Sequence, residues 1–243
     1  MPKSKVIIDA VNAEIPLEQS LRQLCVLAHD VGNSELEHWA ESELSGYSDN
    51  NQLPEYRVSE SLNFTYTGIN NYALRVTNVS LPISFLSKDT LDAVKKVHLT
   101  DGISYIEKLS QSETALQVDC SVLAGEVSKL SNGKVQCCVI NQNISPAVCS
   151  NVVAEVVSRV IKAFMLLEDQ YGSLDDLGIT VKSKAATDAS NSNINSVVLN
   201  LPVPNEECET AGSKIAWNII IPIVTAIVGA VLGAGAIKLL GWG

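Results

Sequence analysis

The chain is poor in positive charge. Of its 243 residues, 17 are Lys or Arg and 27 are Asp or Glu, which leaves a formal net charge of −10. Affinity for phosphate backbones and for anionic lipid headgroups grows with each Lys or Arg that neutralises a negative charge. The composition therefore disfavours direct binding to nucleic acid and to anionic membrane surfaces.

Motifs of common catalytic and metal sites are also missing. The sequence has no G-x-S-x-G, no Walker loop and no dinucleotide fingerprint. It has no C-x-x-C pair, and no histidines complete a zinc set with its six cysteines: Cys25, Cys120, Cys137, Cys138, Cys149 and Cys208. We therefore expect no metal and no cofactor. The cysteines are typical of small apolar residues in a reducing compartment, and on a strand Cys137 and Cys138 would point to opposite faces.

Titratable groups crowd in one part of the sequence, at His29, Asp30, Glu35, Glu37, His38, Glu41 and Glu43. His38 and Glu41 would share a helix face, but two ligands do not make a metal site. On a helix with an apolar stripe, such charges usually form the solvated opposite face. We therefore nominate no catalytic residue and predict that the chain is not an enzyme.

The N-terminal part has the pattern of an antiparallel helical hairpin. Pro16 begins a helix that Gly32 ends, with apolar residues every three or four positions at Leu17, Leu21, Leu24, Leu27 and Ala28. Ser34 and Glu37 form a capping box for a second helix, whose buried stripe is Leu36, Trp39, Ala40 and Leu44 and which ends at Gly46.

Alternating apolar residues after Pro54 predict a small antiparallel sheet. Tyr56 and Val58, residues 62–66 and residues 74–76 predict strands, with a turn at 68–71, and residues 135–140 predict another strand. Two short helices are expected between them, one capped by Ser87 or Asp89 and carrying apolar residues at 91–97, and one over residues 103–109.

A long helix is predicted from Pro146 to about residue 171. Its apolar face is wide enough to have neighbours on two sides, which predicts the central element of the core: Val152, Val153, Val156, Val157, Val160, Ile161, Phe164 and Leu167. Residues 179–181 and 197–201 predict strands, and the Ser- and Asn-rich segment 185–195 between them predicts a mobile loop. Residues 202–213 predict an extended tether.

A membrane span is predicted at Ile215–Ile237, which has no ionisable side chain between Lys214 and Lys238. A helix of this length reaches about 35 Å, and the hydrocarbon core of a bilayer is about 30 Å thick. Trp217 and Trp242 would lie at the headgroup level, and the two lysines would extend to water. A buried core helix is the less favoured alternative, because such helices seldom hold so much continuous apolar sequence.

Small residues recur along one face of the predicted span, at spacings of four, three, four and three: Pro222, Ala226, Gly229, Gly233 and Ala236. Gly229 and Gly233 form a G-x-x-x-G pair, along which two helices can approach closely. Such pairs also occur in membrane helices that do not associate, so both interpretations stay open. Asn218 and Thr225 lie beside this stripe and offer polar groups to a neighbouring helix or to water.

Several motif residues have a simple structural interpretation. Trp39 is expected to anchor the two helices, Tyr47 to plug the end of the second helix after Gly46, and Pro54 to begin the strand rigidly. Glu43 and Arg57 can pair and fasten helix to strand; an exposed pair would contribute under ~1 kcal/mol.

A family resemblance is carried by Leu21 to Ala28, Gly32-Asn33, Trp39, Glu43-Leu44, Gly46-Tyr47 and Leu53-Pro54-Glu55-Tyr56-Arg57. With these residues the segment from Pro16 to Arg57 resembles the N-terminal region of AbiTii-type abortive infection proteins, a family linked to prokaryotic defence against phage, and Val157 to Tyr171 echoes it. The core pattern of that family does not require a hydrophobic tail. The resemblance implies a sensing or assembly domain with the span as its output, and it supplies no catalytic residue.

Together these patterns predict an α+β fold with a helical hairpin, a small antiparallel sheet and a long central helix, followed by one C-terminal transmembrane helix. Residues 1–201 would form one domain of ordinary size or two small ones, 202–213 the tether and 214–243 the anchor. No apolar segment near Met1 is long enough for a secretory signal, so the domain is expected to face the cytoplasm from the inner membrane.

Two functions remain open at this point. In the first, the chain is a defence effector that oligomerises in the lipid bilayer on activation and depolarises the membrane. The activating signal would be a nucleotide or a partner such as an Argonaute or another sensor. In the second, it is a constitutive membrane-tethered scaffold that recruits a defence partner.

Overall fold

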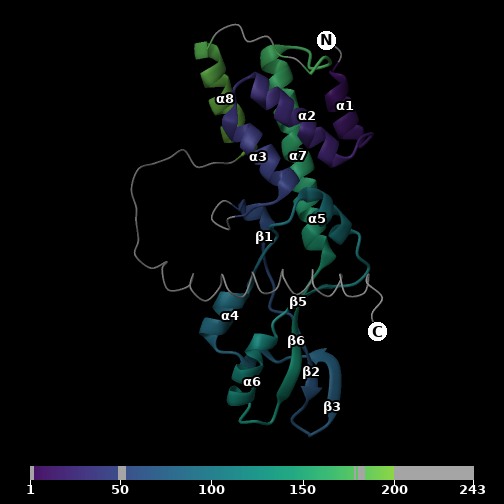
Figure 1. Ribbon diagram of the computed structural model, residues 1–243, viewed down its shortest axis with the longest axis vertical. Helices are drawn as coiled ribbons and strands as arrows, with labels where there is room; N and C mark the ends of the chain where they lie inside the picture. The colour runs from purple at the N-terminus through teal and green to yellow at the C-terminus, as the bar shows by residue number, and fades with distance from the viewer. Residues whose placement is uncertain (1–2, 49–52, 178, 180–183, 200–243) are drawn as a thin grey trace, which may run out of the picture. The chain divides into compact units, whose positions relative to one another are not determined.

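The computed structural model describes residues 3–48, 53–177, 179 and 184–199, which form two compact units (Figure 1). The helical unit comprises the described residues up to Ser59, His98–Thr114 and those from Pro146 onward. The sheet unit comprises Glu60–Val97 and Ala115–Ser145. The chain is therefore α+β.

The membrane prediction falls outside this part of the chain. The tether at 202–213, the span Ile215–Ile237 and its flanking residues all lie beyond the described residues. Among the helices that are described, none combines the length and apolarity that a bilayer crossing requires.

The helical unit consists of α1 (Lys5–Asn12), α2 (Leu17–Asp30), α3 (Ser34–Ser45), the 3₁₀ turn η2 (Glu55–Arg57), α5 (Ile103–Ser110), α7 (Pro146–Tyr171) and α8 (Lys184–Val198). The predicted hairpin is confirmed by α2 and α3, which pack against each other. The cap of α3 differs from the prediction. Asn33 Oδ1, rather than Ser34, accepts a hydrogen bond from Leu36 N at 3.1 Å. An Asn can cap as well as a Ser, so the helix begins one residue earlier than the capping-box motif suggests.

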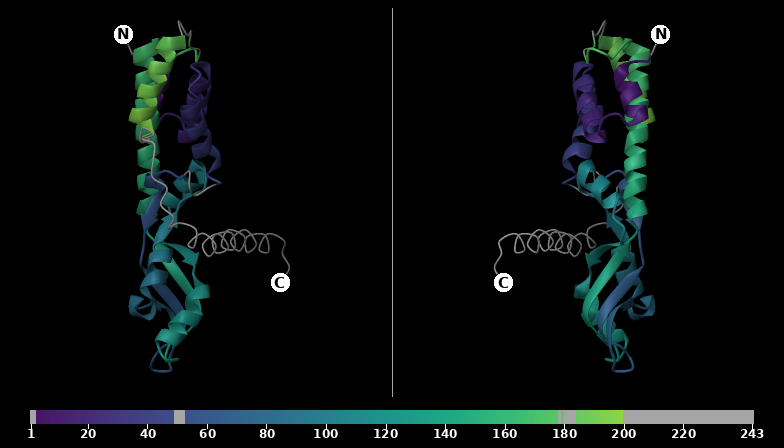
Figure 2. Two further views of the ribbon diagram at one scale, coloured as in Figure 1. Left: turned by 90° about the vertical axis from the view of Figure 1, so that its left-hand side faces the viewer. Right: turned by 90° about the vertical axis from the view of Figure 1, so that its right-hand side faces the viewer.

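The long helix α7 is the central element of the helical unit, as predicted. It packs against α1, α2, α5 and α8, and Figure 2 shows α8 (yellow-green) alongside it. The predicted apolar face is buried at Val152, Val156, Val160, Phe164 and Leu167.

The segment after α7 corrects the prediction. Residues 185–195, predicted as a loop, lie in the helix α8, and Val197 and Val198, predicted in a strand, end that helix. The Ser- and Asn-rich composition disfavours a helix, but Ile194 and Val198 are four residues apart and both are buried. Packing against α7 therefore overrides local propensity.

The sheet unit contains an antiparallel sheet of order β3-β2-β6-β5, covered on one face by short helices. Its elements are β2 (Phe64–Ile69), β3 (Arg75–Ser80), η3 (Ile83–Phe85), α4 (Lys88–Val94), β5 (Leu116–Asp119), η4 (Ser121–Leu123), α6 (Ala124–Leu130) and β6 (Gln136–Ile144). A separate two-stranded sheet pairs β1 (Val58–Glu60) with β4 (Lys96–His98). The predicted strands at 62–66, 74–76 and 135–140 correspond to β2, β3 and β6, which begin at Phe64, Arg75 and Gln136, and the Ser87 cap of α4 is confirmed. Tyr56 lies in η2 and Val97 in β4, which corrects the expected strand at Tyr56 and helix at Val97.

The core of the sheet unit is apolar and lies between the sheet and α6. Phe64, Tyr66 and Ile140 face Leu123 and Val127 in one buried cluster. The pairing of β2 with β3 and its pairing with β6 both shift register directly before Gly68. A Cβ atom at Gly68 would lie 2.0 Å from the Gln136 carbonyl oxygen, so this close approach requires glycine.

Candidate functional site

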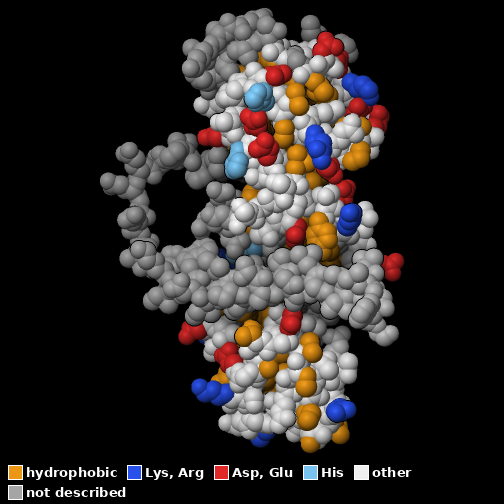
Figure 3. All heavy atoms as spheres, in the orientation of Figure 1, with side chains coloured by type: hydrophobic (Ala, Val, Ile, Leu, Met, Phe, Trp, Pro, Cys, Tyr) orange, Lys and Arg blue, Asp and Glu red, His pale blue; other side chains and the backbone are white. Residues whose placement is uncertain are grey.

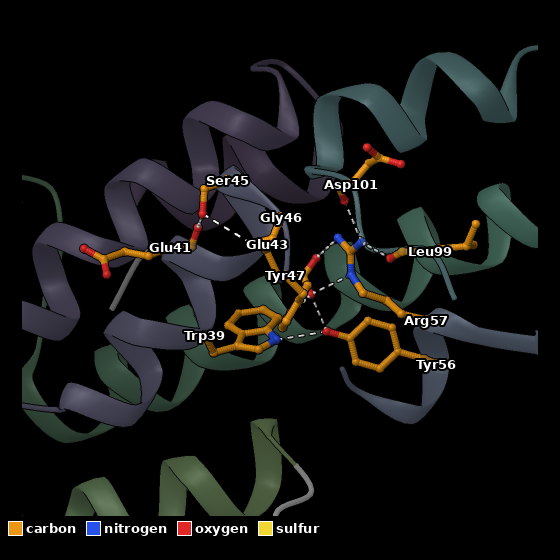
Figure 4. A network of polar contacts seen from close by, with 10 residues as sticks. All are labelled: Trp39, Glu41, Glu43, Ser45, Gly46, Tyr47, Tyr56, Arg57, Leu99 and Asp101. Atoms are coloured by element: carbon orange, nitrogen blue, oxygen red, sulfur yellow. Dashed lines mark hydrogen bonds and ion pairs between the residues drawn. The ribbon is translucent and has the colours of Figure 1, made fainter. Parts of the chain in front are cut away.

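A fully buried ion pair joins α3 to η2 in the helical unit. The guanidinium of Arg57 donates from Nη2 to Glu43 Oε2 at 2.6 Å and from Nε to Glu43 Oε1 at 3.1 Å (Figure 4). Both side chains are 0% exposed. The predicted pairing of Glu43 with Arg57 is therefore confirmed. The pair is buried, so the value of under ~1 kcal/mol that holds for an exposed pair does not apply. Removing either partner would leave a buried charge, which costs several kcal/mol.

Two tyrosines also donate hydrogen bonds to the Glu43 carboxylate. Tyr47 and Tyr56 both donate their hydroxyl to Glu43 Oε1, at 2.7 and 2.6 Å. Trp39 Nε1 in turn donates to the Tyr56 hydroxyl at 2.9 Å. Trp39, Glu43 and Tyr47 are four residues apart, so α3 and the residues just after it project all three toward one side. We call these side chains, with Arg57, the Glu43–Arg57 network.

The network also holds the segment that leads into α5. Arg57 Nη1 donates to the carbonyl oxygens of Leu99 and Asp101, both at 2.8 Å. Tyr47 N donates to Thr100 O at 2.8 Å. The backbone after α3 and the backbone before α5 come close together, and each of the two segments requires a glycine at the contact. A Cβ atom at Gly46 would lie 2.7 Å from Thr100 O, and one at Gly102 would lie 2.4 Å from Leu44 O.

Arg159 of α7 extends the network toward α8. Its guanidinium carbon lies 4.6 Å from the centre of the Tyr56 ring, within the range of a cation–π contact. Arg159 Nε donates to Glu155 Oε1 at 2.8 Å, and Nη1 donates to the carbonyl oxygen of Val198 at the end of α8. Four segments of the helical unit thus meet around one carboxylate.

The electrostatics keep every donor of the network protonated. Burial raises the pKa of Tyr47 and of Tyr56, and the Glu43 carboxylate raises both further. Burial opposes the charge on Arg57, but the hydrogen bonds and charge of Glu43 outweigh it and raise the pKa of Arg57. At neutral pH the tyrosines therefore stay hydroxyl donors and Arg57 stays cationic.

The geometry suits mechanical connection more than chemistry. The hydroxyls of Tyr47 and Tyr56 and the guanidinium of Arg57 are all directed at Glu43 or at backbone carbonyls of the same unit. A general base or nucleophile must instead reach a substrate atom at hydrogen-bond distance. The network fastens α3, η2 and the start of α5 to one another and contacts α7.

The other titratable residues of α2 and α3 lie at the surface. His29, Asp30, Glu35, His38 and Glu41 are exposed, and His29 Nδ1 lies 3.1 Å from Glu37 Oε1. Figure 3 shows acidic side chains and histidines together on the helical unit. Glu43 alone departs from the predicted solvated face. Within the ranges that the structure describes, no three His, Cys, Asp or Glu side chains are placed to hold a metal ion.

A groove of about 590 Å³ lies elsewhere in the helical unit. Its lining comes from α1, α2, α5, α7 and the connection between α1 and α2. Aliphatic side chains such as Val11, Ile15 and Val157 dominate it, and Glu14 and Glu107 contribute carboxylates. A lining of this kind disfavours anionic ligands.

The site residues predicted from the sequence fall into two groups, those at the network and those in the membrane segment. Trp39, Tyr47, Tyr56 and Arg57 come together in the network, and Pro54 caps η2 directly before it. Residues nominated in the membrane segment lie outside the described residues: Lys214, Trp217, Asn218, Pro222, Thr225, Ala226, Gly229, Gly233, Ala236, Lys238 and Trp242.

Sequence reasoning missed Glu43 as the centre of the network and missed Arg159 altogether. The spacing of Trp39, Glu43 and Tyr47 indicated a role for Glu43, because it places the carboxylate between two aromatic residues on one side of the helix. Arg159 lies among buried valines of α7, and an Arg on an apolar face also signals a buried partner.

Comparison with known proteins gives one match. The AbiTii family model matches residues 4–193, which cover both units and most of α8. No curated protein and no solved structure matches the chain.

Proposed function

The chain belongs to the AbiTii family, and we propose that it is the membrane-anchored effector of an anti-phage defence system. Membership of this family implies a role in abortive infection. In the proposal the two units face the cytoplasm and receive the activating signal, residues 202–213 tether them, and residues 214–243 anchor the chain in the inner membrane. Activation clusters the anchors of several copies, which depolarises the membrane.

The observation that carries this proposal is the uncharged run Ile215–Ile237 with its small-residue stripe. Insertion requires only an apolar segment of sufficient length, which the run has. The stripe adds a surface on which helices can pack closely, and a single helix cannot form a pore. Asn218 and Thr225 supply polar groups beside that surface.

The folded units support a role in sensing and assembly. The Glu43–Arg57 network connects α3 with the segment before α5, with α7 and, through Arg159, with the end of α8. Its groups are directed at one another, which favours a protein that acts by assembly and catalyses no reaction. The signal would come from a partner protein, such as an Argonaute or another sensor, or from a nucleotide.

Anchoring is tested by deleting Lys214–Gly243. The full chain should stay in the membrane fraction after an alkaline carbonate wash, and the truncated chain should appear in the soluble fraction, folded. A truncated chain that still sediments with membranes would place the anchor elsewhere.

Assembly is tested by Gly229→Leu together with Gly233→Leu. The bulkier side chains separate helices along the stripe, so crosslinked oligomers and depolarisation should both fall while membrane content stays level. The matched control is Val231→Leu with Gly235→Leu, which lies about half a turn away on the opposite face and should behave like the parent. If the stripe variant depolarises cells as well as the parent does, the scaffold function becomes the better account.

A further inference from the structure

The second half of α8, residues 190–198, contacts the helical unit through few apolar side chains. Among its residues from Ser190 onward, Ile194 and Val198 are fully buried, while Asn193 and Val197 are exposed. α7, by comparison, buries side chains along most of its length, from Cys149 to Leu167. Since burial of apolar surface supplies most of the free energy of packing, residues 190–198 contribute less to packing than α7 does.

Some buried polar atoms of α8 have no hydrogen-bond partner among the described residues. Asn191 Nδ2 donates to Val31 O at 3.2 Å and Asn195 Nδ2 donates to Glu35 Oε2 at 2.5 Å. The carbonyl oxygens of the same two side chains, Asn191 Oδ1 and Asn195 Oδ1, are buried without a hydrogen-bond partner among the described residues. Asn33 Nδ2, which is buried where α2 passes into α3, lacks one as well. Release of α8 would let water satisfy such atoms, so part of the cost of undocking is already offset.

The end of α8 is tied to the Glu43–Arg57 network. Arg159 donates to the carbonyl oxygen of Val198, and its guanidinium lies over Tyr56, whose hydroxyl donates to Glu43. Val198 directly precedes the segment that leads to the predicted span. One side chain therefore joins the buried network to the point where the chain leaves the helical unit.

We propose that α8 is a releasable latch that keeps the membrane output silent while it is docked. This inference rests on the proposed function. With α8 docked, the tether of about 12 residues reaches at most roughly 40 Å. Undocking would add the 15 residues of α8 to the tether and let anchors of neighbouring copies meet without displacing the folded units. Exposure of the surface under Ile194 and Val198 accompanies release.

The test compares Ile194→Asp with Asn193→Asp in the full chain. Both variants add the same charge to the same helix, but only the first places it in a buried position. Hydrogen exchange of residues 190–198 should speed up by about tenfold or more in Ile194→Asp, and cells should depolarise without phage. Asn193→Asp should match the parent in both measurements.

A reversible version separates release of α8 from misfolding. Glu35→Cys and Asn195→Cys, added to Ile194→Asp, allow a short bis-methanethiosulfonate reagent to fasten α8 beside α3 in proteoliposomes filled with a fluorescent dye. The crosslinked protein should retain the dye, and reductant should start its release. Ile194→Asp without the two cysteines should leak before and after the reagent.

The outcomes distinguish the latch from the proposed function. If α8 exchanges quickly in Ile194→Asp while depolarisation stays at the parental level, or if the crosslinked protein still leaks, the latch is overturned and the membrane effector stands. If exchange does not change, α8 is not a weakly held helix and the latch is overturned as well. If the parent never depolarises cells even after phage challenge, the proposed function fails first.

Discussion

The two units of this chain are stabilised by different chemistry. The helical unit buries a full ion pair, Glu43 with Arg57, inside a set of charged and hydroxyl groups. The sheet unit buries neutral amides instead. Gln142 donates to the carbonyl oxygens of Ser61 and Val94 at 2.7 and 2.9 Å, and an ion pair of this unit, Lys95 with Asp92, lies at the surface.

This difference predicts where the molecule responds to its surroundings. A buried ion pair contributes little net stability compared with apolar residues of the same volume, but it is strongly coupled to every group that contacts it. Neutral amides do not titrate and respond weakly to salt. We therefore expect changes of charge to act on the helical unit and changes of side-chain volume to act on both units separately.

The largest effect is expected for Glu43→Ala. Removing the carboxylate leaves Arg57 buried without its partner, and the unfolding free energy of the helical unit should fall by about 3–5 kcal/mol. Urea unfolding followed by Trp39 fluorescence, with Trp217 and Trp242 replaced by Phe, measures it. The paired change Glu43→Leu with Arg57→Met should cost much less, because no charge stays buried. If Glu43→Ala lowered hydrogen-exchange protection in β2 and β6 as much as in α3, the two units would not respond separately.

A smaller loss is expected for Tyr56→Phe. This variant keeps the ring under Arg159 but removes one donor to Glu43, and a hydrogen bond to a charged group is typically worth about 1.5–3 kcal/mol. Tyr72→Phe is the matched control, since Tyr72 is 77% exposed and should change stability by less than about 0.5 kcal/mol. Equal thermal stability of both variants and the parent would show that the Tyr56 hydroxyl contributes nothing to the network.

For the sheet unit, the sharpest probe is Gly68→Ala. The added methyl would overlap the Gln136 carbonyl, so the β2–β6 pairing has to shift, at a cost of about 1–3 kcal/mol. Gly125→Ala in α6 meets no atom within 4 Å and should instead gain up to about 1 kcal/mol from helix propensity. Amide exchange in β6 measures the effect, and protection in α3 should be unaffected. If α3 loses protection to the same extent, the units do not respond separately.

The smallest effect concerns pH and the attachment of α1. Hydrogen bonds from Lys3 and then from Ser4 lower the pKa of Glu168 to about 2. A carboxylate with a lowered pKa contributes stability above its ordinary pKa and loses it as the pH falls toward 2. Exchange of the α1 amides should therefore rise between about pH 5 and pH 2 in the parent. Glu168→Gln should exchange faster at pH 7 and show a flatter pH profile; an unchanged profile would contradict the role of Glu168.

Helix periodicity predicted much of the helical unit. α2, α3, α5 and α7 were all visible from apolar spacing and capping residues, because each buries a regular stripe. α8 was missed because its Ser and Asn content indicates a loop, and only its packing on α7 stabilises the helix. α1, β5 and α6 were missed: β5 has only four residues, and α1 and α6 lack a side-chain cap such as the one that Ser87 provides for the short helix α4.

The site was only half visible in the sequence. Trp39, Tyr47, Tyr56 and Arg57 were identified, since aromatic residues and an Arg in a motif suggest packing. Their common partner was treated as a surface charge, because spacing along one helix does not show which neighbour covers it. The contact of Arg159 with Tyr56 joins residues about a hundred positions apart, which only the tertiary fold brings together.

The central claim is that the chain depolarises the membrane through its C-terminal segment, and a membrane-potential dye tests it most directly. Cells that express the full chain with its neighbouring genes should lose their membrane potential after phage challenge, and cells that express the chain without Lys214–Gly243 should keep it. If cells with the full chain arrest infection while their membrane potential stays intact, the chain is not a depolarising effector.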